Sequence, residues 1–80
     1  MNNNFEVFNE FLVAEEFIKA ATFALGCAKG CGSNRNHAMW LGYAVHAATQ
    51  HSPELGEAVN IASGNGRWGN IEAASAALLA

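Results

Sequence analysis

The chain has 80 residues, of which 51% are hydrophobic and only 14% are charged, and its formal net charge is −3. Its four basic residues are Lys19, Lys29, Arg35 and Arg67; they form no basic stripe, which argues against direct binding to nucleic acid. No apolar run approaches the ~18 residues of a membrane-spanning helix, and the acidic start of the chain differs from the basic start of a secretory signal. We therefore expect a cytoplasmic protein that forms one domain over residues 1–80 and does not bind membranes.

The first predicted element is one long amphipathic helix over residues 5–29. Apolar side chains recur there at spacings of three and four residues, which places them on one stripe of a helix: Val7, Phe11, Ala14, Ile18, Ala21, Leu25 and Ala28. Asn3 or Asn4 can cap its start. Gly30 or Gly32 is expected to end it in the left-handed conformation that glycine adopts without strain.

The second predicted helix covers residues 35–51 and has almost no polar face. Ser33, Asn34 or Asn36 can cap its start. A helix of this composition is either central in the fold or half exposed for a partner. Gly42 stands in the middle of it, where glycine is unfavourable, so we expect a close crossing with another helix there.

Two short helices are predicted in the rest of the chain. The stretch 52–55 is SPEL, in which Ser52 is suited to the cap and Pro53 to the first helical position. The glycine-rich stretch 63–66 ends this helix, and Asn70 can cap a last one. The inward face of the last helix is expected to comprise Ile71, Ala74 and Leu78. The sequence therefore predicts an all-α fold: a small bundle-like array of about four helices, with one long N-terminal helix, one apolar central helix and two short C-terminal helices.

Cys27, Cys31 and His37 are the candidate metal-binding residues, because zinc accepts thiolate and imidazole ligands. With His46 they form a C-x3-C-x5-H-x8-H series, which is not the spacing of a zinc finger or zinc ribbon. His37 and His46 would lie ~13 Å apart along a continuous helix and could not share one ion. We expect the two thiols to pack as small, partly buried side chains, with no metal and no cofactor. A metal site and a disulfide are the alternatives.

The histidines are not expected to be catalytic. His37 and His51 share one helix face, but they lie ~21 Å apart along the helix axis. No serine or glutamate stands in a recognisable catalytic relation to either of them. We therefore expect no enzymatic activity.

The loop SGNGRWGN at residues 63–70 contains the pattern G-x-G-x-x-G. Nucleotide-binding loops of this kind follow a β-strand, and no strand is predicted before it. The preferred interpretation is a turn between two helices. The alternative is a recognition loop, because Arg67 and Trp68 belong to the residue types enriched at binding hot spots. Trp68 is equally compatible with a core position that closes the bundle.

Glu6, Glu10 and Glu16 are predicted to lie on one broad side of the first helix, away from its apolar stripe. Such acids usually form a solvated helix face. The functional alternative is an acidic surface that occupies the basic groove of a nucleic-acid-binding partner.

The acidic N-terminal stretch NNNFEVFNEFLVAEEF and the alanine-rich closing stretch NIEAASAALLA carry a family resemblance. The chain resembles the small intracellular proteins that phages and mobile elements use against host defences, including anti-CRISPR proteins, which are short, acidic, single-domain and free of catalytic motifs. The resemblance is one of size, acidity and helical composition without a shared motif, so it transfers no residue role. It implies action by binding, with a CRISPR effector complex as the larger protein partner.

These observations favour a protein that acts by protein–protein contact, as an inhibitor or adaptor. The residues expected to contact the partner are Glu6, Glu10, Glu16, Arg67 and Trp68. The acids would supply charge and the loop would supply anchors. The first alternative is a structural homo-oligomer that buries its apolar second helix against a copy of itself. The second alternative is a metal or redox module at Cys27 and Cys31.

Overall fold

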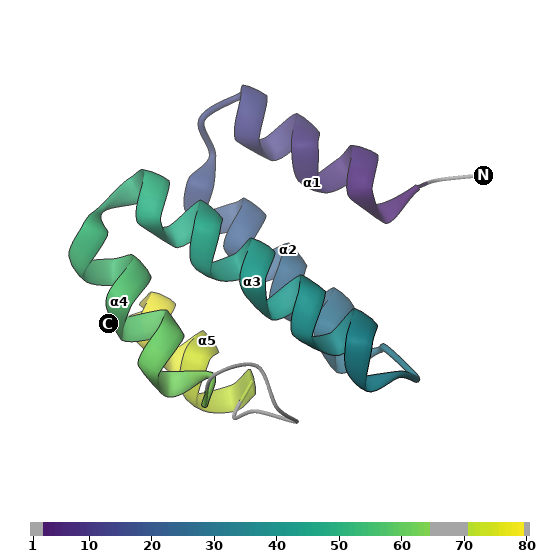
Figure 1. Cartoon of the computed structure of the whole chain (residues 1–80). Coiled ribbons are helices and arrows are strands. Elements are labelled where there is room, and N and C mark those ends of the chain that lie inside the picture. The colour runs from purple at the N-terminus through teal and green to yellow at the C-terminus, as the bar shows by residue number, and fades with distance from the viewer. Residues whose placement is uncertain (1–2, 65–70, 80) are drawn as a thin grey trace.

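The computed structural model describes residues 3–64 and 71–79, which form five α-helices (Figure 1). They are α1 (Asn4–Val13), α2 (Phe17–Lys29), α3 (Asn34–His51), α4 (Pro53–Ala62) and α5 (Ile71–Leu79). The predicted all-α class is confirmed, whereas the predicted number of about four helices is one too few. None of these five helices is both long and apolar enough to cross a membrane.

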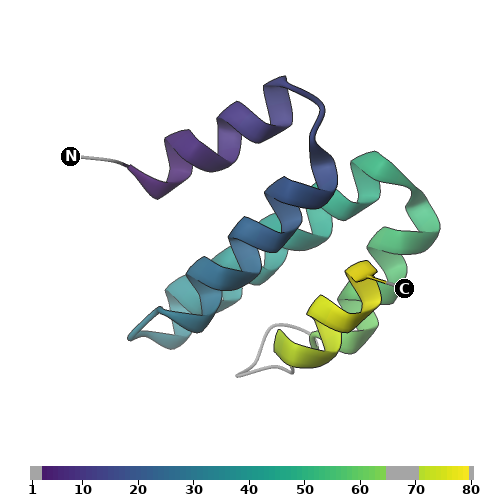
Figure 2. The same ribbon diagram turned by 180° about the vertical axis from the view of Figure 1, so that it is seen from behind.

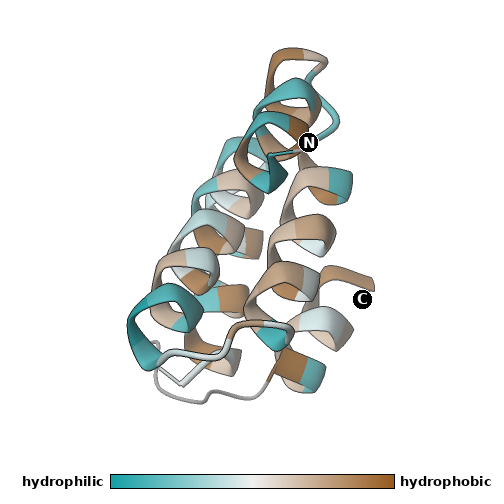
Figure 3. Ribbon diagram, turned by 90° about the vertical axis from the view of Figure 1, so that its right-hand side faces the viewer, coloured by the Kyte–Doolittle hydropathy of each residue, from teal (hydrophilic) through white to brown (hydrophobic). Residues whose placement is uncertain are grey.

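Four of the helices are arranged in two layers of two (Figures 1 and 2). α3 and α4 form one layer, and α2 and α5 lie behind them. α3 therefore packs against both α2 and α4, and α5 packs against both α4 and α2. α1 runs alongside α2 and α3, on the side opposite α4 and α5 (Figures 1 and 2), and lies above the two layers in the side view of Figure 3. It contacts α2.

The single long helix predicted at the start of the chain is wrong, because the chain turns at Ala14, Glu15 and Glu16. Glu15 has a left-handed backbone conformation with φ of 59°. Its N–H donates to the Leu12 carbonyl at 3.0 Å, and the Glu16 N–H donates to the Phe11 carbonyl at 2.9 Å. This pair of hydrogen bonds is a Schellman motif, which satisfies carbonyls at the end of α1 without the usual glycine.

The turn has a physical reason in the aromatic residues of α1. In a straight helix, α1 would extend past the rest of the fold and its apolar face would be left in water. Folding α1 back buries Phe8, which is only 2% exposed, against Trp40 and Tyr43 of α3. Burying a phenylalanine contributes about 1.5–3 kcal/mol. This gain offsets the roughly 1–2 kcal/mol that one left-handed residue costs.

Three of the predicted helix starts are confirmed by their caps. Asn3 caps α1, Ser33 caps α3 and Ser52 caps α4. Each side-chain oxygen accepts a backbone N–H of the first turn at 2.9–3.2 Å. Because one such cap contributes ~1 kcal/mol, these local signals help to set where the helices begin.

The end of α2 differs from the prediction. Neither Gly30 nor Gly32 has the expected left-handed conformation, and Gly30 is right-handed with φ of −85°. Its N–H still donates to the carbonyl of Gly26 at 3.2 Å, so the helix ends by continuing its own hydrogen-bond pattern. In the described part of the chain, positive φ angles occur at Glu15 and Gly64.

The apolar second helix was predicted to be either central in the fold or half exposed for a partner. In the structure this helix, α3, is central. Its buried side chains lie between α2 and α4: His37, Trp40, Leu41, Ala44, Ala47 and Ala48. Eight of the fourteen buried apolar residues in the described ranges are alanines, most of them on α2 and α3. Small side chains therefore fill most of the space between the two longest helices. Ala74 and Leu78 of α5 are buried, as predicted.

The close helix crossing is at Gly56 rather than at Gly42, where it was predicted. A Cβ at Gly42 would meet no neighbouring atom within 4 Å. At Gly56 of α4, a Cβ would overlap the Thr49 side chain and would lie 2.8 Å from the Thr49 Cα on α3. Glycine is therefore required where α4 folds back against α3.

We expect Gly56→Ala to lower the free energy of unfolding by about 1–3 kcal/mol, the usual range for overpacking. Gly42→Ala is the matched control, since it changes an exposed glycine within a helix, and it should raise that free energy by up to ~1 kcal/mol. Urea denaturation followed by circular dichroism measures both variants. Stabilisation by Gly56→Ala would show that the crossing has room for a side chain.

Candidate functional site

α1 is attached to the rest of the fold by an aromatic cluster. The aromatic cluster consists of Phe5, Phe8, Phe11, Phe23, Trp40 and Tyr43. The Phe8 ring lies 5.9 Å from the Trp40 ring, nearly perpendicular to it, and 5.5 Å from the Tyr43 ring. Phe5 stacks on Tyr43 at 5.4 Å. Such pairs contribute about 0.5–1.5 kcal/mol beyond their burial, so the inner face of α1 is firmly held.

Sequence reasoning missed the aromatic cluster. The available signal was the recurrence of phenylalanine at Phe5, Phe8 and Phe11, a spacing of three that places the rings on neighbouring positions of one helix side. This signal says that α1 has an aromatic face. It does not say that the face turns back onto α3.

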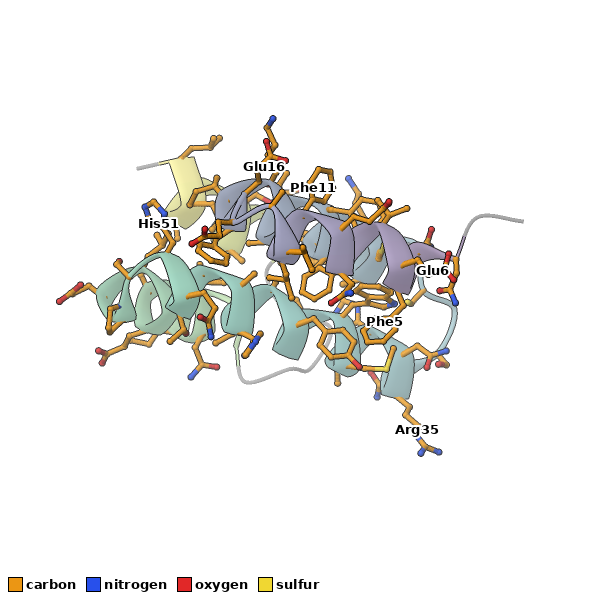
Figure 4. All side chains as sticks on the ribbon, turned by 90° about the horizontal axis from the view of Figure 1, so that it is seen from above. Phe5, Glu6, Phe11, Glu16, Arg35 and His51 are labelled. Carbon is orange, nitrogen blue, oxygen red and sulfur yellow. The ribbon has the colours of Figure 1, made fainter. Side chains whose placement is uncertain are left out.

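The opposite side of α1 is exposed and acidic. We call it the outer face of α1, and it comprises Glu6, Asn9, Glu10 and Val13. Val13 is 77% exposed, and α1 contains no basic residue. Figure 4 shows Phe5 directed toward α3 while Glu6 lies at the N-terminal end of α1. Glu6 is in the first turn, where the helix dipole favours a negative charge.

Glu16 is separated from the other two predicted contact acids by the turn. It is the residue before α2. The prediction that it shares a helix face with Glu6 and Glu10 is therefore wrong. Its Oε1 also accepts a hydrogen bond from Lys19 Nζ at 3.2 Å, which partly balances its charge. The structure therefore brings Glu6 and Glu10 together and leaves Glu16 apart.

The other two predicted contact residues, Arg67 and Trp68, lie outside the described residues. The same is true of the predicted cap Asn70. Their roles stay predictions from the sequence.

The two cysteines are half-buried free thiols at the end of α2. The Cys31 thiol donates to the Cys27 carbonyl at 3.1 Å. Both line an open groove of about 460 Å³, whose other lining residues are Asn4, Phe23, Gly26, Gly30 and Trp40. Burial, together with the neighbouring Cys31, raises the pKa of the Cys27 thiol above its ordinary value. A raised pKa favours the neutral thiol, which is a weak nucleophile.

His37, the third candidate metal ligand, has a structural role. It is buried, and its Nδ1 donates to the Ala28 carbonyl at 2.9 Å, which ties the start of α3 to the end of α2. Within residues 3–64 and 71–79, no three histidine, cysteine, aspartate or glutamate side chains are grouped so that they could hold a metal ion.

Comparison of the chain with protein-family models, with curated proteins and with solved structures finds no match. The geometry of α1 and its charges are therefore the basis for the function proposed below.

Proposed function

We propose that this protein acts by binding a larger protein through the outer face of α1. The observation that carries the proposal is the division of α1 into two faces. Its inner face is anchored by the aromatic cluster, and its outer face presents Glu6 and Glu10 to solvent. Neither acid forms an ion pair with any other described residue. A rigidly held helix with unbalanced acids on its outer side is suited to docking on a basic surface.

The chemistry of this face defines the kind of partner. Two carboxylates one helical turn apart, with exposed Val13 beside them, complement a basic groove with apolar patches. Grooves that bind nucleic acid are basic, so a nucleic-acid-binding protein is the proposed partner. The resemblance to anti-CRISPR proteins extends this proposal to inhibition of a CRISPR effector complex.

The two alternative functions have less support. A homo-oligomer through the apolar second helix would need the apolar side chains of α3 at the surface. Most of them are instead buried between α2 and α4 within one chain. A module based on Cys27 and Cys31 would need a reactive thiolate, whereas burial favours the neutral thiol of Cys27.

We expect the double charge reversal Glu6→Lys with Glu10→Lys to slow association with the partner, because surface charges mainly steer the encounter. Added salt should slow the wild type more than the variant, because salt screens exposed charges. Biolayer interferometry against purified CRISPR effector complexes, at low and physiological salt, measures both rates. The dissociation rate should change little.

The matched control is Glu54→Lys with Glu57→Lys on α4. This pair also has one acid in the first helical turn and a second acid close behind it, and both are exposed. It changes the net charge equally but lies on another helix. If the control variant lowers the association rate equally, the effect comes from net charge, and α1 is not the binding surface. If the wild type binds none of these complexes, the assignment to CRISPR effectors is refuted.

A further inference from the structure

The turn between α1 and α2 is formed by residues whose local sequence favours a continuous helix. Ala14, Glu15 and Glu16 are all residues that favour helix, and neither glycine nor proline interrupts them. Glu15 nevertheless has the left-handed conformation, with φ of 59°, that suits glycine. Its side chain is exposed, so packing of that side chain does not impose the turn. A straight helix through these residues is therefore a close competitor of the turn.

Straightening the turn would separate α1 from its binding site on its own chain. One continuous helix from Asn4 to Lys29 would have 26 residues and a length of about 39 Å. Phe8 would then lie nine positions before the first residue of α2, about 14 Å further along the axis, and could no longer reach Trp40 of α3. The site on α3 would be left open.

In the straightened form, α1 has no site to pack on and the site on α3 is open. A second copy of the chain can supply both. We propose that two copies exchange α1, so that the aromatic residues of each α1 pack on Phe23, Trp40 and Tyr43 of the other copy. Every contact that α1 makes in the aromatic cluster is rebuilt between chains, and each Glu15 becomes helical instead of left-handed. Exchange of one identical element is a low-cost route to a dimer. This dimer goes beyond the proposed binding function and does not depend on it.

Substitutions at Glu15 test the exchange, because they change the balance between the turn and the straight helix without changing any core residue. Glu15→Gly removes the strain of the turn and weakens the straight helix, so the dimer dissociation constant should rise roughly 30-fold or more, counting both turns. Glu15→Val should lower it, because a β-branched residue strongly disfavours the left-handed conformation. Glu15→Gln keeps the conformational preference and controls for the lost charge. Sedimentation velocity at several concentrations measures all four proteins.

The exchanged contacts distinguish this dimer from any other. In a dimer refolded from a mixture of isotope-labelled and unlabelled Glu15→Val chains, isotope-filtered nuclear Overhauser spectra should show contacts between the Phe8 ring of one chain and the Trp40 ring of the other. A dimer in which these contacts stay within one chain overturns the proposal. So does a Glu15→Val protein that is monomeric at its highest soluble concentration.

Discussion

Replacing Trp40 by alanine is expected to lower the free energy of unfolding by about 3–5 kcal/mol. Trp40 is only 8% exposed, and its ring lies 5.9 Å from that of Phe8, 6.3 Å from that of Phe23 and 5.4 Å from that of Tyr43. Trp40→Ala would therefore remove the ring that joins α1, α2 and α3. A loss of this size is a large share of the 5–15 kcal/mol typical of small proteins. Urea denaturation followed by circular dichroism measures it without using tryptophan fluorescence.

Phe5→Ala is the control for this prediction. Phe5 belongs to the same aromatic cluster but is 49% exposed and touches the edge of the cluster through Tyr43. Its loss should lower the free energy of unfolding by only about 0.5–1.5 kcal/mol, the contribution of one aromatic pair. Equal losses for Phe5→Ala and Trp40→Ala would mean that Trp40 does not centre the cluster.

Replacing Leu41 by alanine is expected to lower the free energy of unfolding by about 2–5 kcal/mol, the range for a buried leucine. Leu41 is 2% exposed on the central helix α3, so its removal leaves a cavity in the core. The same denaturation experiment measures it. Leu79→Ala, at an 85% exposed position of α5, is the matched control and should have almost no effect. A cost below about 1 kcal/mol for Leu41→Ala would place this residue outside the core.

The features of the fold that could be predicted from the sequence are those set by neighbouring residues. Ser33 and Ser52 cap helices through bonds to residues three positions later, and Pro53 is favoured at a first helical position. These interactions need no contact with the rest of the chain. For this reason the starts of α3 and α4 were predicted to within a residue.

The features that could not be predicted depend on contacts between distant helices. The left-handed Glu15 follows from the burial of Phe8 against Trp40, which local sequence does not reveal. Likewise Gly42 and Gly56 both stand within helices, and only the approach of Thr49 makes one of them necessary. In each case the position of a second helix decides the outcome.

The positions of the candidate contact acids could be predicted in part, for the same reason. Glu6 and Glu10 share a face because they are four residues apart on one helix, which is a local property. Glu16 was misplaced because the turn at Glu15 separates it from α1. The aromatic residues that hold this face in position come from three helices, so the sequence alone did not assemble them.

The alanines between α2 and α3 have a consequence for how stability varies with temperature. Alanine exposes little apolar surface when the chain unfolds, and eight of the fourteen buried apolar side chains in the described ranges are alanines. The heat capacity of unfolding grows with the apolar surface exposed, and it averages about 12–15 cal/mol/K per residue in globular proteins. This protein should fall below that average, so its free energy of unfolding should follow a flatter curve against temperature. Its free energy of unfolding would then change little across a wide range of temperatures.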